Sequence, residues 1–73
     1  MQNEEIKKDN EGMAAGEKFM LTIKEAAPYF NVGEKKMRRL AEDHLGDFAV
    51  YSGNRYLIIR TKFEEFVMNS SEI

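Results

Sequence analysis

The sequence predicts a small α+β fold in which three short helices accompany one two-stranded hairpin. Apolar residues recur at helical spacing in three segments, which indicates the helices. Two short runs rich in β-branched and aromatic residues lie on either side of a turn signal, which indicates the hairpin. A chain of 73 residues has room for one domain, and without cysteine its core has no disulfide or thiolate metal site to support it.

A capping box marks the predicted start of the first helix. Thr22 and Glu25 have the spacing of this motif. In it, the threonine hydroxyl accepts a hydrogen bond from a backbone amide of the first turn, and the glutamate side chain accepts one from the backbone amide of the threonine. Pro28 removes one hydrogen bond, so we expect a short helix that bends or tightens near Ala27 and ends in a turn over residues 31–33. The apolar stripe of this helix consists of Ile23, Ala26, Ala27 and Phe30.

The second helix is predicted over residues 34–44, and Gly46 is placed to end it. At about 100° per residue, its charged side lies opposite its apolar side. The apolar side carries Met37, Leu40, Ala41 and His44. The charged side carries Lys35, Arg39 and Glu42, with Lys36 and Arg38 on its flanks. Two short helices joined by a few residues that include glycine form a helix-turn-helix, whose second helix can enter the major groove of DNA.

The hairpin is predicted from two runs at residues 48–51 and 56–59, with turn-forming residues at 52–55 between them. If Gly53 and Asn54 form the loop, the register of the two strands follows. One face then takes the pairs Val50–Leu57 and Phe48–Ile59, and the other takes Ala49, Tyr51, Tyr56 and Ile58.

A second capping box is predicted at Thr61 and Glu64, where it begins a third helix. The apolar stripe of that helix consists of Phe63, Phe66 and Val67. The order helix, turn, helix, hairpin, helix is that of a winged helix-turn-helix, with the hairpin as the wing. We therefore expect a disordered acidic tail at residues 1–18, a winged-helix DNA-binding domain at residues 19–68 and a flexible C-terminal end at residues 69–73.

The charge distribution leaves room for a DNA partner. The formal net charge of −2 argues against nucleic acid, but residues 33–60 hold six basic and four acidic side chains. The four cations of the second helix could form an ordinary solvated face, yet their position in a helix-turn-helix favours contact with DNA. The wing tip could reach a minor groove, although its residues also suit a plain tight turn. The candidate DNA-binding residues are Lys35, Lys36, Arg38, Arg39, Asn54 and Arg55.

Other functional classes find little support in the sequence. We expect His44, the only histidine, to pack or to stabilise a helix end rather than to bind a metal. No nucleophile with a base and an orienting group can be assembled, and no glycine-rich phosphate loop is present. We therefore expect no enzymatic activity, no cofactor and no small-molecule substrate. The sequence contains neither the apolar core of a signal peptide nor an apolar run long enough to span a bilayer. We therefore expect a cytoplasmic protein without a membrane partner.

Three stretches, residues 21–30, 32–42 and 53–55, resemble the excisionases of conjugative transposons, and the likeness covers residues 19–68. Its most specific part is the block Gly-Glu-x-Lys-x-Arg-Arg-Leu-Ala-Glu. The resemblance implies a recombination directionality factor that binds and bends DNA near the ends of an integrated mobile element. Such a factor helps a tyrosine integrase to excise the element and performs no strand chemistry itself. The resemblance places the recognition helix at residues 34–43 and the wing at residues 48–59, with Asn54 and Arg55 at the tip.

Two alternatives share this predicted fold. One is a small transcriptional regulator, because helix-turn-helix geometry does not distinguish promoter binding from recombination. The other is a protein-interaction module in which the cationic helix face is incidental. For an excisionase, the first candidates for contact with the integrase are Lys62, Glu65 and the tail after Met68, and copies of the protein could associate cooperatively on DNA.

Overall fold

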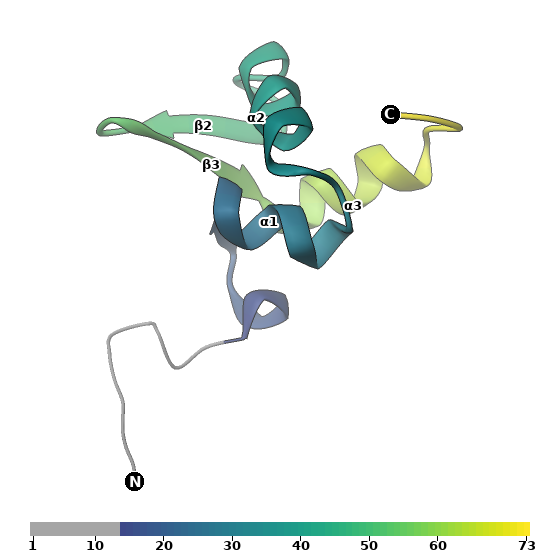
Figure 1. Ribbon diagram of the computed structural model, residues 1–73, viewed down its shortest axis with the longest axis horizontal. Coiled ribbons are helices and arrows are strands. Elements are labelled where there is room, and N and C mark those ends of the chain that lie inside the picture. Colours follow the sequence, from purple (N-terminus) through teal and green to yellow (C-terminus); the bar gives the residue numbers. More distant parts are fainter. Residues whose placement is uncertain (1–13) are drawn as a thin grey trace, which may run out of the picture.

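The computed structural model of the chain describes residues 14–73 and shows the small α+β winged helix that the sequence predicts. Figure 1 shows the wing extending away from the helices on one side, while the last helix runs off on the other. In chain order, the elements are the 3-10 helix η2 (Ala15–Glu17), β1 (Met20–Thr22), α1 (Ile23–Phe30), α2 (Glu34–Asp43), β2 (Ala49–Ser52), β3 (Arg55–Ile59) and α3 (Arg60–Met68). Within this described part, no helix combines the length and apolarity needed to cross a bilayer.

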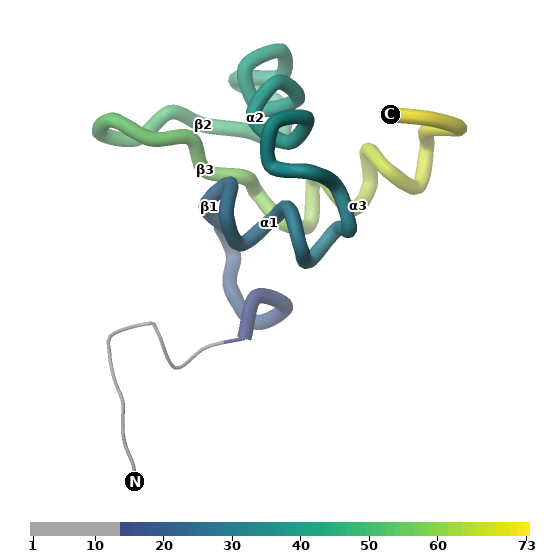
Figure 2. The backbone as a smooth tube through the Cα atoms, viewed as in Figure 1, coloured from purple at the N-terminus to yellow at the C-terminus, as the bar shows by residue number. Residues whose placement is uncertain are grey.

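The sheet confirms the predicted hairpin register and adds a strand. Strands β2 and β3 are antiparallel, and Val50 lies opposite Leu57 as predicted. The hairpin is joined by β1, which pairs with β3 so that the strand order is β1-β3-β2. Figure 2 shows β1 beside β3, leading directly into α1. Strand β1 was not predicted from the sequence, because three residues are too few to show a strand period.

The first helix begins with the predicted capping box. The Thr22 hydroxyl accepts the Glu25 amide at 3.2 Å, and Glu25 Oε1 accepts the Thr22 amide at 2.9 Å. Helix α1 continues past Pro28 to Phe30. It ends at Asn31, whose φ of 61° is left-handed, and the chain then turns into α2 as expected.

The capping box predicted at Thr61 and Glu64 for the start of the third helix is wrong. Strand β3 runs directly into α3, so Ile59 is both the last strand residue and the N-cap, and it has no side-chain oxygen to offer. Glu64 instead accepts from Arg60 Nη1 at 3.0 Å and from the Tyr29 hydroxyl at 3.4 Å. The sequence pattern failed here because no loop residue separates the two elements.

An aromatic cluster joins the helices to the start of the wing. Phe63 of α3 is fully buried, with its ring centroid 4.5 Å from that of Phe30 and 4.8 Å from that of Phe48. His44 stacks on Phe48 at 4.6 Å, and its Nδ1 lies 2.8 Å from the Leu40 carbonyl oxygen, so the packing role predicted for it is observed. The buried core consists of Leu21, Ile23, Ala26, Ala27, Met37, Ala41, Phe48, Ala49, Ile58 and Phe63.

A short 3-10 helix lies before the predicted domain boundary at residue 19. Residues 1–13 of the predicted tail lie outside the described residues, but η2 lies within residues 14–18. Lys18 then forms an ion pair with Glu25, and its carbonyl oxygen accepts from Arg60 Nε at 2.8 Å. These contacts attach the segment before β1 to both α1 and α3.

The environment of Glu25 predicts a pH-dependent part of the stability. Burial raises the pKa of Glu25, but hydrogen bonds from Lys18 and Thr22 and the charge of Lys18 outweigh burial and hold this pKa below its ordinary value. Because the folded pKa lies below the unfolded one, about 4.3, the stabilisation is complete above that pH and is lost as pH falls through the folded pKa. We expect Glu25→Gln to lower the melting temperature at pH 7 by roughly 2–5 °C.

The difference in melting temperature between Glu25→Gln and the wild type should shrink as the pH is lowered from 5 to 3. Thermal unfolding followed by circular dichroism measures it. Glutamine keeps the oxygen that accepts the Thr22 amide, so the variant removes the charge rather than the cap. Glu65→Gln, at an exposed position of α3, is the matched control and should show no such convergence. A difference for Glu25→Gln that stays constant over this pH range would contradict the expectation.

Candidate nucleic-acid interface

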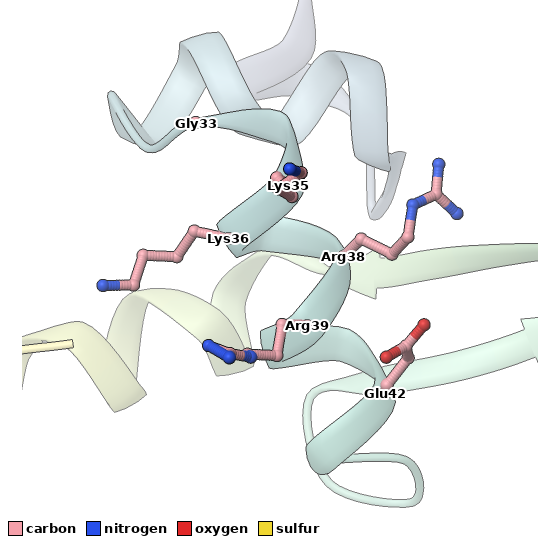
Figure 3. A pocket seen from close by; sticks show the side chains of 6 residues that line it. All are labelled: Gly33, Lys35, Lys36, Arg38, Arg39 and Glu42. Atoms are coloured by element: carbon pink, nitrogen blue, oxygen red, sulfur yellow. The ribbon is translucent and has the colours of Figure 1, made fainter.

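Helix α2 presents its cations to solvent because its opposite side is held in the core. Met37 and Ala41 are fully buried and fix the helix against the rest of the fold. The other side is exposed, and Figure 3 shows its long side chains fanning out from the helix. The exposed cations are Lys35, Lys36, Arg38 and Arg39. The structure thus brings together the four helix residues that the sequence predicted, on one exposed surface.

These four cations line a shallow depression along α2 together with Gly33 and Glu42. The ion pairs found within residues 14–73 join Lys18 to Glu25 and Arg60 to Glu64. No Asp or Glu side chain within residues 14–73 forms an ion pair with any of the four α2 cations. Exposed cations gathered along one helix produce a positive potential that attracts phosphate groups.

Within residues 14–73, the side chain of Lys36 forms one hydrogen bond. Its Nζ donates to the backbone oxygen of Ile73 at 2.7 Å, so residues near the C-terminal end lie beside α2. A phosphate contact by Lys36 requires the exchange of this exposed hydrogen bond. The flexibility expected of residues 69–73 stays a prediction.

The wing brings the other two predicted residues to the same side of the molecule. Gly53 turns the hairpin with a φ of 67°, a conformation that glycine adopts without strain. Asn54 and Arg55 follow it and are exposed. A second groove contains both of them and also Arg38 of α2. Arg38 thus belongs to both surfaces and connects the helix cations to the wing tip.

Lys24 is a candidate that sequence reasoning missed. It lies in the first turn of α1, is exposed, and lines the groove shared by Arg38, Asn54 and Arg55. In the sequence it appears as a lone lysine beside Glu25, without a charge pattern. Its place in the first helix could have identified it, because the first helix of a helix-turn-helix crosses the DNA backbone.

Lys62 and Glu65 lie on a different surface. Both line a third groove between α3 and the segment before β2, with Asp47, Phe66, Asn69 and Ser70. This groove shares no residue with the other two. The candidate partner contacts therefore lie apart from the candidate DNA contacts. Within residues 14–73, no group of three or more histidine, cysteine or acidic side chains is arranged to hold a metal ion.

Comparisons with known proteins identify a family for this region. A helix-turn-helix domain family matches residues 20–71. A curated relative, the excisionase from transposon Tn916 in Streptococcus agalactiae serotype V, is 44% identical over 52 residues. The alignment spans 70% of this chain and 78% of the relative. The family match includes β1, α1, α2 and the wing, and with them every residue that lines the first two grooves.

Proposed function

The chain belongs to the excisionase family of helix-turn-helix proteins, and from this we propose that it binds the ends of an integrated mobile element and promotes excision of that element. The observation that carries the proposal is the position of Arg38, which joins the cations of α2 to the wing tip in one surface. Such a surface suits two adjacent grooves of one duplex. In this proposal a tyrosine integrase cleaves and joins the strands, and this protein supplies DNA architecture.

The two parts of the surface have different tasks in this proposal. Helix α2 enters the major groove, where Arg38 and Arg39 can read guanine through paired hydrogen bonds and the two lysines contact phosphates. Arg55 at the wing tip enters the neighbouring minor groove, whose potential favours arginine. Filling two grooves from one rigid domain favours a bent duplex, with a bending cost of about 1–6 kcal/mol that the added contacts offset.

The third groove supports the proposed integrase contact. Because Lys62 and Glu65 lie apart from the residues proposed to hold DNA, they stay accessible to a protein while α2 occupies the major groove. Cooperative association of several copies on neighbouring sites is also part of the proposal.

Binding to the element ends tests the function directly. We expect duplexes from the ends of the host element to bind at least about 1,000-fold more tightly than scrambled duplexes at moderate salt. The measurement is fluorescence anisotropy over a series of salt concentrations, followed by footprinting of the end fragments with and without integrase. Equal affinity for end and scrambled duplexes would overturn the proposal. A footprint at the ends without any gain in excision by integrase would instead favour a regulator of the same fold.

A further inference from the structure

One groove gathers cations from three elements that are distant in the sequence. Lys24 comes from the first turn of α1, Arg38 from α2 and Arg55 from the first position of β3. All three side chains are exposed. The other residues that line this inter-element groove are Thr22, Ile23, Asn54 and Tyr56.

The inter-element groove is positive without an internal counter-charge. Its lining contains no carboxylate, and none of its three cations belongs to an ion pair within residues 14–73. Like charges close together repel one another, and a groove lined by one sign of charge concentrates its field on an ion of the opposite sign. The groove is therefore suited to an anion from outside the molecule.

The position of the groove identifies that anion. A major groove and the adjacent minor groove are separated by one sugar-phosphate backbone. If α2 occupies the first and the wing the second, this backbone passes between them, where the inter-element groove lies. The groove is lined both by Arg38 of α2 and by Arg55 of the wing, which fits such a path.

We infer that the inter-element groove holds a backbone phosphate of the strand that runs between the two occupied DNA grooves, and that Lys24 donates to its oxygens. This inference rests on the proposed function and adds a DNA contact from α1. A phosphate contact positions the protein but carries no base information. Lys24 therefore contributes to the affinity for every duplex and sets the register of α2 and the wing on the backbone.

The test is the salt dependence of binding for Lys24→Gln, with Lys24→Arg as the matched control that keeps the charge. For Lys24→Gln, we expect binding about 3- to 10-fold weaker and a salt slope smaller by about 0.9, equally for end and scrambled duplexes. Lys24→Arg should restore the wild-type slope. A wild-type slope for Lys24→Gln, or a loss confined to end duplexes, would overturn the inference.

A scan of the DNA backbone tests the same contact without depending on any variant's folding. Each duplex carries one uncharged methylphosphonate in place of a phosphate. We expect this replacement to weaken DNA binding by the wild type at one position, between the two occupied grooves. At that position Lys24→Gln should lose no further affinity, because the partner of the phosphate is already gone. Fully additive losses at every position would contradict the inference. A wild type that binds end and scrambled duplexes equally would overturn the proposed function, and the slope comparison on scrambled DNA would still decide the role of Lys24.

Discussion

The double variant Arg38→Ala/Arg39→Ala is expected to bind element-end DNA about 100-fold or more weakly than the wild type. Each arginine that forms paired hydrogen bonds to a guanine contributes about 1–3 kcal/mol of discrimination, so losing two removes most of the preference for the end sequence. Both side chains are exposed on α2, so the substitutions should leave the fold intact. The measurement is fluorescence anisotropy with end and scrambled duplexes.

The matched control removes the same number of charges from the same helix. Lys35→Ala/Lys36→Ala should reduce the salt slope by a similar amount, because both variants lose two cations. The control should, however, keep the ratio between end and scrambled affinities. An Arg38→Ala/Arg39→Ala variant that also kept this ratio would show that the arginines contribute charge rather than base recognition.

Phe63→Ala is expected to have the largest effect on folding. Phe63 is fully buried and its ring packs against those of Phe30 and Phe48, so truncation leaves a cavity where α3 meets α1 and the wing. Such substitutions cost about 3–5 kcal/mol. A domain of this size has a total free energy of unfolding of about 4–11 kcal/mol, so the variant should lose a large part of its stability and unfold at a much lower urea concentration.

Urea unfolding followed by circular dichroism measures this effect. Phe19→Ala is the matched control, because it is the same substitution at a side chain that is 65% exposed. We expect the control to change the free energy of unfolding by less than about 0.5 kcal/mol. Similar losses for the two variants would mean that the aromatic cluster around Phe63 does not hold the domain together.

The elements that sequence predicted well are those with local physical signals. The hairpin register followed from Gly53 and Asn54, because a loop of these two residues fixes which residues of the two strands lie opposite one another. The start of α1 followed from Thr22 and Glu25, whose reciprocal hydrogen bonds need only each other. The core side of α2 followed from its period, since Met37 and Ala41 recur at helical spacing.

The features that sequence missed depend on residues far apart in the chain. Strand β1 forms because Leu21 pairs with Ile58, and nothing near Leu21 in the sequence indicates that partner. The capping box at Thr61 failed because β3 continues into α3 without a loop. Lys24 enters the candidate site only through its proximity to the wing. The roles proposed for the DNA-contacting residues, and for Lys62 and Glu65, stay predictions until binding is measured.

From the position of strand β1 in the sequence we expect an order in the folding of this chain. The β2–β3 hairpin closes over a short turn, so it can form within about 1–10 μs of collapse. β1 must reach β3 across α1 and α2, which costs more loop-closure entropy. During synthesis, we therefore expect β1 to complete its pairing only after Ile59 has left the ribosome. Because Thr22 ends β1 and caps α1, the pairing of this strand with β3 fixes the start of the first helix against the sheet.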